Sequence, residues 1–471
     1  MRILLINPRI DNMITTNIPC FVDEQRGYNP PLGLMYVAAY TEQYTDHEIE
    51  ILDMLAEEVT YAQLESELRK RKPDIVGITT TTFTLIDTMI VAKIAKAVNK
   101  NIKIILGGPH VYIYPEETIR LPEVDFLVLG EGELPFVELL QNIDSYESLK
   151  SMKGIVFEHE GEIINNGTRK FIEELDSLPF PARHLTKVNK YSSLLAKRTP
   201  ITTMLTSRGC PYKCLFCYRP HLGKKFRARS AVNVVNEMEE CANMGIKEIL
   251  VYDDTFTIDR QRVMDICSLI LKRNLDITWD IRTRVNIVDM EMLKTLKKAR
   301  CERIHYGIES ANPDILKVLR KGITIPQVEL AFKMTKEVGI STLAYFMLGS
   351  PTESKEQIMN TIAYAKKLKP DYCHFAITTP YPATPLYEMG IRMGMFGDYW
   401  REFAANPRKD FEPQYWEEGL SRNELTQLLN YAYKSFYARP AYVLRQIVKV
   451  RSLSEFAGKV KAGLKVIWKD S

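Results

Sequence analysis

The sequence predicts an α/β protein in which two successive parallel sheets are followed by a helical region. Three observations lead to this prediction. Strand and helix signals alternate over residues 2–142, they alternate again over 201–380, and beyond 395 the pattern is helical and aromatic. Such alternation is typical of parallel sheets covered by helices. A chain of 471 residues also exceeds one compact core, which favours two or three domains.

The first series predicts a Rossmann-like, doubly wound open sheet. Its apolar runs are expected to be buried strands at 2–7, 48–54, 74–80, 103–108 and 125–130. Helical patterns separate them at 32–44, 60–72, 84–99, 115–121 and 134–143. No G-x-G-x-x-G motif follows the first strand, so a dinucleotide ligand is not favoured.

The carboxyl ends of these strands carry glycines and small hydroxyl residues. A ligand of a doubly wound sheet sits beyond these ends, and such residues let a large planar ligand approach the backbone. By themselves they indicate only a nucleotide or cofactor binder. The candidate contacts are Thr79, Thr80, Thr82, Gly107, Gly108, His110, Glu131 and Gly132.

A connector and a second alternating series follow. "GIVFEHEGEIINNG" predicts a hairpin and "LDSLPFPAR" a proline-rich linker. Strands are then expected at 201–207, 248–254, 278–284, 303–310, 341–349 and 372–380. Six β/α units predict a parallel sheet curved into a partial (β/α)6 barrel, whose chemistry gathers at the carboxyl ends of the strands. We therefore expect regions 1–145, 146–200 (linker and hairpin), 201–395 and 396–471 (helical, with a basic tail).

Three cysteines follow the first strand of this second series. Cys210, Cys214 and Cys217 are spaced C-x3-C-x2-C within "TSRGCPYKCLFCYRP". A structural zinc site wants four protein ligands, and His221 is the nearest alternative fourth one. A four-cysteine cluster is not favoured, because no fourth cysteine lies at motif distance. Three thiolates fit a [4Fe–4S] cluster with one iron left open.

This loop resembles the signature of the radical S-adenosylmethionine (SAM) superfamily. The resemblance implies that the open iron binds SAM, which an electron from the cluster cleaves to methionine and a 5'-deoxyadenosyl radical. It assigns Cys210, Cys214 and Cys217 to the cluster, as metal ligands and catalytic residues. Further motifs, "VYDDTFTID", "IRTRVN", "YGIES" and "FMLGSPTES", resemble SAM-contacting segments of that family. The implied SAM contacts are Phe216, Tyr218, Asp253, Asp254, Arg282, Glu309, Ser310 and Gly349. A sixth motif, "PYPATPLYE", has Ala383 where relatives often have glycine.

The first sheet resembles the cobalamin-binding domain of cobalamin-dependent radical SAM enzymes. The similarity includes "NPPLGLMYVAAYT", the threonine run, "LGGPH" and "GEGE". The D-x-H-x-x-G motif that supplies an axial histidine in other cobalamin proteins is absent, since "DMLAEEV" occupies this region. The resemblance therefore implies bound cobalamin without a histidine of that motif, and the His110 side chain is expected to make a loop hydrogen bond.

The resemblance implies a methyltransferase in which methylcobalamin methylates a carbon radical and a second SAM restores the methyl group. A cyclase or ring-rearranging enzyme of the same family is the alternative. A methylthiotransferase acting on RNA is disfavoured, because the first domain has only Cys20 and the C-terminus is helical. A cobalamin sensor is disfavoured because it would have no use for the polar strand ends of the barrel.

Charge and composition limit the expected cellular location and the expected binding partners. The chain is 45% hydrophobic and 26% charged, and the start "MRILLINP" has no signal-peptide pattern, so we expect a cytoplasmic protein. Residues 439–471 carry eight basic and two acidic residues, although the whole chain has a net charge of only +4. This tail is either a solvated helical face or an amphipathic segment lying on an anionic membrane. Expected partners are a small apolar or lipid-like substrate and an electron donor such as flavodoxin or ferredoxin, with no nucleic acid.

Overall fold

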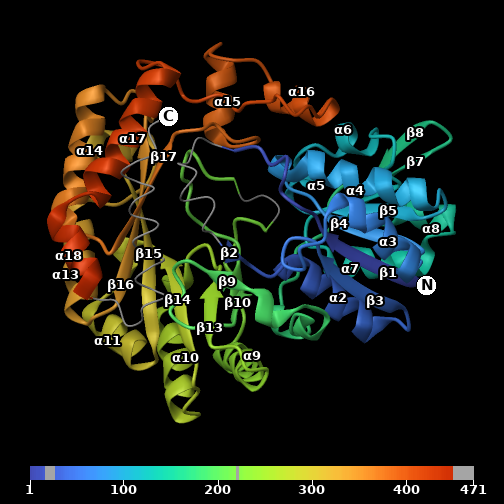
Figure 1. Ribbon diagram of the computed structural model, residues 1–471, viewed down its shortest axis with the longest axis horizontal. Coiled ribbons are helices and arrows are strands. Elements are labelled where there is room, and N and C mark those ends of the chain that lie inside the picture. The colour runs from blue at the N-terminus through green and yellow to red at the C-terminus, as the bar shows by residue number, and fades with distance from the viewer. Residues whose placement is uncertain (16–26, 219–221, 449–471) are drawn as a thin grey trace.

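A computed structural model describes residues 1–15, 27–218 and 222–448. Two sheets lie side by side, with the first on the right of Figure 1 and the second on the left, and residues 385–405 extend across the top. The predicted fold class is confirmed. In the described part of the chain, no helix is both long and apolar enough to span a bilayer.

The first sheet has the strand order β3-β1-β4-β5-β6-β7-β8. The first five strands in this order run parallel, and the hairpin β7–β8 extends the edge in antiparallel fashion. The hairpin that the sequence placed in the connector thus belongs to this sheet. The strands are β1 Arg2–Asn7, β3 Glu48–Asp53, β4 Ile75–Thr79, β5 Lys103–Gly107, β6 Phe126–Val128, β7 Ile155–His159 and β8 Glu162–Asn165.

Helices cover both faces of this sheet because its strands are apolar on both sides. Along β1, Leu4 and Ile6 face one buried cluster, and Ile3 and Leu5 face the other. All five predicted helices are present, and two short ones, α5 and α8, were not predicted. The helices are α2 Leu32–Tyr44, α3 Tyr61–Arg71, α4 Leu85–Val98, α5 Pro109–Ile113, α6 Pro115–Ile119, α7 Glu133–Asn142 and α8 Tyr146–Ser151, with the 3-10 turn η1 Thr82–Thr84.

The second sheet is entirely parallel, in the order β10-β13-β14-β15-β16-β17. Because β10 and β17 are its two edges, it is a partial rather than a closed barrel. Its strands are β10 Ile201–Met204, β13 Glu248–Val251, β14 Thr278–Thr283, β15 Cys301–Glu309, β16 Ser341–Leu348 and β17 Tyr372–Ile377. The covering helices are α9 Ala231–Asn243, α10 Arg260–Lys272, α11 Met290–Lys298, α12 Pro313–Val318, α13 Ile325–Glu337 and α14 Lys355–Leu368.

The two faces of this second sheet differ in burial. Side chains such as Ile304, Ala344 and Phe375 are fully buried under the helices. The alternate side chains on β16 and β17 point to the inner face and are only half-buried. This inner face is therefore not filled like that of a closed barrel.

The C-terminal helices contact both domains, each domain through a different helix. These are α15 Pro385–Arg392, α16 Tyr399–Ala405, α17 Arg422–Tyr437 and α18 Pro440–Val448. Trp400 of α16 is fully buried, and its indole donates to the Pro380 carbonyl at 2.9 Å. The same aromatic cluster includes Tyr114 of the first domain, which places α16 beside α6 (Figure 1). Residues 449–471, most of the tail for which an amphipathic segment was considered, lie outside the described residues.

A buried ion-pair triad attaches the linker to the second domain. Glu237 of α9 accepts from Arg183 of the linker at 2.5 Å and from Arg229. All three side chains are almost fully buried. Minor elements complete the connection: β2 Gly27–Tyr28, η2 Leu175–Ser177, η3 Arg183–Leu185, η4 Val188–Lys190, β9 Ser192–Ser193, β11 Ser207–Arg208 and β12 Arg227–Ala228.

We expect Glu237→Ala to lower the free energy of unfolding by ~3–5 kcal/mol, because it leaves two buried arginines unpaired. The matched control is Glu239→Ala on the same helix, whose ion pair with Arg273 is partly exposed. Its expected cost is below about 1 kcal/mol. Urea unfolding of the two variants checks this, and equal costs would contradict the assigned role of the triad.

Candidate active site

The cysteine loop begins at a position that only glycine fits well. Gly209 has a φ of +84°, and a Cβ atom there would lie 2.2 Å from the Lys225 carbonyl oxygen. The next residue, Cys210, is buried with its Sγ 3.8 Å from Thr255 Oγ1. Cys214 and Cys217 are half-buried. One thiol is thus shielded from water, while the other two lie nearer the surface.

Asp253 holds the start of this loop in place. One of its carboxylate oxygens accepts from the Thr206 amide at 2.6 Å, and the other accepts from the Thr206 and Ser207 hydroxyls at 2.5 and 2.6 Å. The side chain is fully buried. Asp253 therefore supports the backbone before Cys210, whereas the neighbouring Asp254 is half-buried.

The far side of the loop is attached to two other segments. The Leu215 amide donates to the Leu319 carbonyl at 3.0 Å, and the Leu215 carbonyl accepts from the Leu386 amide at 3.0 Å. Phe216 packs beside the cluster that Leu215 and Leu386 form with Trp416. These contacts fix the loop between α12 and α15. Tyr218 follows Cys217, and burial raises the pKa of its phenol.

Of the two arginines in "IRTRVN", Arg284 lies beside the cysteines. Its Nη1 is 3.8 Å from Cys214 Sγ, and its guanidinium stacks 3.9 Å from the centre of the Tyr212 ring. Arg282, the sequence candidate, instead donates to the Val251 carbonyl at 2.5 Å and stacks on Tyr252. Arg284 thus places a positive charge beside one of the three cysteines.

Glu309 ends the fourth strand in a strained conformation. Its φ is +73°, which is uncommon for a residue with a side chain. Its carboxylate accepts from Lys321 Nζ at 2.8 Å, and both groups are more than nine-tenths buried. Lys321 Nζ also lies 5.9 Å from the centre of the Phe216 ring. The strained turn thus points a carboxylate and an ammonium group toward the cysteine loop.

Glu353 shapes the turn after the fifth strand. Its carboxylate accepts from the Gly349 and Ser350 amides at 2.9 and 3.0 Å and from the Ser310 hydroxyl at 3.2 Å. Gly349 has a φ of +74°, and a Cβ there would lie 2.5 Å from Leu425. Burial raises the pKa of Glu353 to about 7, although these three hydrogen bonds favour its ionised form.

At the edge of the first sheet, the β4 and β5 loops are locked together. The Thr80 amide donates to the Gly107 carbonyl at 2.7 Å, and a Cβ at Gly108 would lie 2.7 Å from the Thr80 carbonyl oxygen. His110 is fully buried and its Nδ1 lies 3.0 Å from Thr82 Oγ1, the kind of loop hydrogen bond expected. Burial lowers the pKa of His110 to about 3, so the ring is neutral. Thr79 and Gly132 are half-buried at the same edge.

Glu131 connects this edge to the second domain. Its carboxylate pairs with Arg208 at 2.8 Å and with Arg227 at 2.9 Å, and Glu133 pairs with Arg208 at 2.5 Å. These side chains are at most 6% exposed. The Glu131 side chain is therefore committed to an interdomain ion pair, and the cysteine loop faces the strand ends of the first sheet.

The sequence did not single out Arg284, Lys321, Thr255 or Glu353. Arg284 and Glu353 lie within motifs that were noted, so closer attention to every charged residue of those motifs would have found them. Lys321 has no local signal, because its partner Glu309 lies on a different element.

The donor set of the loop fits an iron–sulfur cluster better than a single metal ion. The seven described cysteines form no disulfides with one another. Across residues 1–15, 27–218 and 222–448, no three His, Cys, Asp or Glu side chains converge on a point that one ion would occupy. A four-iron cluster spreads its thiolates over separate irons and needs no such convergence. His221, the alternative zinc ligand, lies outside the described residues.

The edge of the first sheet fits a large flat cofactor. Its loops carry short side chains, and His110 Nε2 is buried without a hydrogen-bond partner in the described part of the chain. Two family models match the protein: the B12 binding domain over residues 19–140 and the radical SAM superfamily over 204–365. Fold and site thus define a cobalamin-dependent radical SAM enzyme.

A full-length relative agrees with this class. The chain is 37% identical over 451 residues, 95% of each chain, to the uncharacterized methyltransferase PH0819 of Pyrococcus horikoshii. It therefore belongs to the cobalamin-dependent radical SAM family, and its cofactors are a [4Fe–4S] cluster, SAM and cobalamin.

Other relatives extend the comparison. The anaerobic magnesium-protoporphyrin IX monomethyl ester cyclase of Rubrivivax gelatinosus is 28% identical, over 99% of this chain and 82% of its own. The cobalamin-dependent SAM radical enzyme OxsB, solved with aqua-cobalamin and SAM bound, shares the fold with a TM-score of 0.74 at 18% identity. That match covers 99% of this chain and 72% of OxsB.

We expect Cys214→Ala to lose nearly all cluster iron, because two thiolates cannot hold the cluster on this loop. Cys267→Ala is the matched control, since Cys267 is buried in the core of the second domain. Iron analysis and the absorption spectrum of anaerobically purified proteins check this. Equal iron content in the two variants would remove Cys214 from the ligand set.

We expect Glu353→Gln to change how stability depends on pH. A carboxyl group with a raised folded pKa binds more protons in the folded state, so its contribution to stability falls as pH rises toward about 7. The wild type should therefore lose roughly 2 kcal/mol relative to the variant between about pH 5 and pH 7. Urea unfolding at several pH values measures the difference, and parallel pH profiles would contradict it.

Proposed function

We propose that this enzyme methylates an unactivated carbon of a small molecule. The observation that carries the proposal is the similarity to a methyltransferase over 95% of both chains. Supporting it, the carboxyl edge of the first sheet faces the cysteine loop through the Arg208 ion pairs. When bound, the cluster and SAM supply a hydrogen-abstracting radical, and cobalamin carries the methyl group.

We assign the candidate residues to the three cofactors as follows. Cys210, Cys214 and Cys217 hold the cluster, with the positive charge of Arg284 beside Cys214. Asp254, Arg282, Glu309, Ser310, Gly349, Phe216 and Tyr218 remain the proposed SAM contacts, and Asp253 acts by positioning the loop. The proposed cobalamin contacts are the backbone and short side chains of Thr79, Thr80, Thr82, Gly107, Gly108 and Gly132, with His110 buried beneath them.

A cyclase or ring rearrangement is the second candidate. It is supported by the similarity to the Rubrivivax gelatinosus cyclase over 99% of this chain. The two candidates differ in whether a methyl group enters the product.

The setting and partners are proposals as well. The substrate is an apolar or lipid-like small molecule, and a flavodoxin or ferredoxin supplies electrons. We place the enzyme in the cytoplasm without a nucleic-acid partner. The basic segment 439–471 is proposed to contact the membrane surface.

Product mass after anaerobic turnover tests the proposal. Full-length enzyme with its three cofactors is given a lipid extract from cells that lack it, together with SAM carrying a deuterated methyl group. We expect a product that retains the label and, with ordinary SAM, is heavier by ~14 Da per event. Cys214→Ala should give none. A product whose mass changes without any label would favour the cyclase.

A further inference from the structure

The inner face of the second sheet carries half-buried side chains on its last two strands. On β16 and β17, Tyr345, Met347, His374 and Ala376 are half-buried, whereas their alternates pack beneath the helices. Tyr345 is paired in register with Gly307. A Cβ at Gly307 would lie 2.5 Å from the Glu309 carboxylate. Tyr345 is therefore next to the strand end that faces the cysteine loop.

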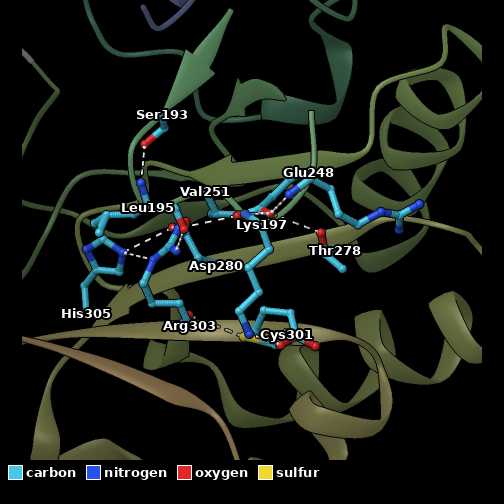
Figure 2. Close-up of polar contacts among 12 residues, drawn as sticks. Ser193, Leu195, Lys197, Glu248, Val251, Thr278, Asp280, Cys301, Arg303 and His305 are labelled. Carbon is cyan, nitrogen blue, oxygen red and sulfur yellow. Dashed lines mark hydrogen bonds and ion pairs between the residues drawn. The ribbon is translucent and has the colours of Figure 1, made fainter. Parts of the chain in front are cut away.

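Beneath Tyr345 lies a buried polar cluster, which is shown in Figure 2. His305 Nδ1 lies 2.9 Å from the Tyr345 hydroxyl, and His305 Nε2 lies 3.1 Å from Asp280 Oδ2. Arg303 donates to the same Asp280 oxygen at 2.5 Å, and its Nε lies 3.1 Å from His305 Nε2. Asp280, Arg303 and His305 are each at most 4% exposed.

The cluster is balanced in charge once Arg282, which lies 3.8 Å from Asp280, is counted, and it is anchored at the amino ends of the strands. Glu248 lies 3.5 Å from Arg303 and accepts from the Lys197 amide at 2.7 Å. Arg303 also donates to the Leu195 carbonyl. Burial lowers the pKa of His305 to about 4, although Asp280 opposes this, so the imidazole is neutral. Burying such groups is costly unless they pair with one another, as Arg303 and His305 do with Asp280 here.

The neutral ring of His305 has two arrangements with opposite consequences for Tyr345. If Nε2 accepts from Arg303, Nδ1–H donates to the Tyr345 oxygen and leaves the phenol proton to point outward. If Nε2–H donates to Asp280, Nδ1 accepts the phenol proton and leaves the Tyr345 oxygen as an acceptor. In both arrangements the phenol is oriented, and its remaining hydrogen-bonding positions are directed away from His305.

We propose that Tyr345 is the residue that anchors the substrate on the inner face of the second sheet, by a hydrogen bond to an uncharged hydroxyl group of an otherwise apolar molecule. His305 and Asp280 are positioning residues behind it. The substrate hydroxyl can both donate and accept a hydrogen bond. It can therefore pair with Tyr345 in either arrangement of His305. Met347 and Ala376 supply apolar surface beside it. The inference rests on the proposed function, because it assumes that the substrate of that reaction binds at the inner face of the second sheet.

The test measures binding without turnover and therefore does not depend on whether the reaction is methylation. Full-length enzyme with its three cofactors, but without reductant, is dialysed against 1-octanol or against nonane, in which a methyl group replaces the hydroxyl. We expect Tyr345→Phe to weaken octanol binding roughly 5- to 10-fold, the value of one hydrogen bond, and to change nonane binding less than about twofold.

Two further variants make the test specific. Tyr431→Phe, at an exposed tyrosine of α17, should leave octanol binding unchanged. His305→Asn, which can replace only the Nδ1 contact, should weaken octanol binding less than Tyr345→Phe. The proposal is overturned if the wild type does not bind octanol, or if Tyr345→Phe affects both probes equally or neither.

Unlabelled products in the methylation assay, with the octanol preference intact, would refute the proposed reaction while keeping the substrate anchor. Labelled products from an enzyme without that preference would refute the anchor alone.

Discussion

The ion pairs that join Arg208 and Arg227 to Glu131 and Glu133 are the constraint on which the rest of the site depends. They hold the carboxyl edges of two independent sheets face to face, and Arg208 stands only two residues before Cys210. Such buried pairs tolerate little change in geometry, because an unpaired charge in the interior costs several kcal/mol, about 3–5 by mutation. The cysteine loop is therefore fixed against the cobalamin-domain edge rather than merely tethered to it.

Two buried carboxylates at the strand ends accept hydrogen bonds from neighbouring loops of the protein itself. Asp253 is occupied by Thr206 and Ser207, and Glu353 by the turn at Gly349. Because their hydrogen-bonding capacity is used, these groups position neighbouring loops. Asp253 and Glu353 therefore do not count among the proposed SAM contacts, which include Asp254 and the strained Glu309.

The half-open second sheet explains how a buried polar cluster coexists with a substrate face. A closed barrel would fill its interior with side chains. Here the sheet ends at two free edges, so the inner side chains of β16 and β17 stay half-buried. The cluster of Asp280, Arg303 and His305 lies at this sheet (Figure 2), and the Tyr345 hydroxyl lies 2.9 Å from His305 Nδ1.

The sequence by itself determined the elements, their order and the identity of the cysteine loop. Hydrophobic period and strand–helix alternation are local signals, which is why ranges such as 32–44 and 355–368 agree with α2 and α14. The C-x3-C-x2-C spacing is equally local. These signals were enough for the fold class and the cofactors.

Only the tertiary structure decided which partner each polar side chain takes. Glu131 meets Arg208 across 77 residues, and Lys321 meets Glu309 from another element. Tertiary structure also decided that Arg284, and not the expected Arg282, lies beside Cys214. It likewise decided that the hairpin β7–β8 belongs to the first sheet. Hydrogen bonds and ion pairs depend on distances of a few ångströms between segments far apart in the chain, and no local pattern carries that information.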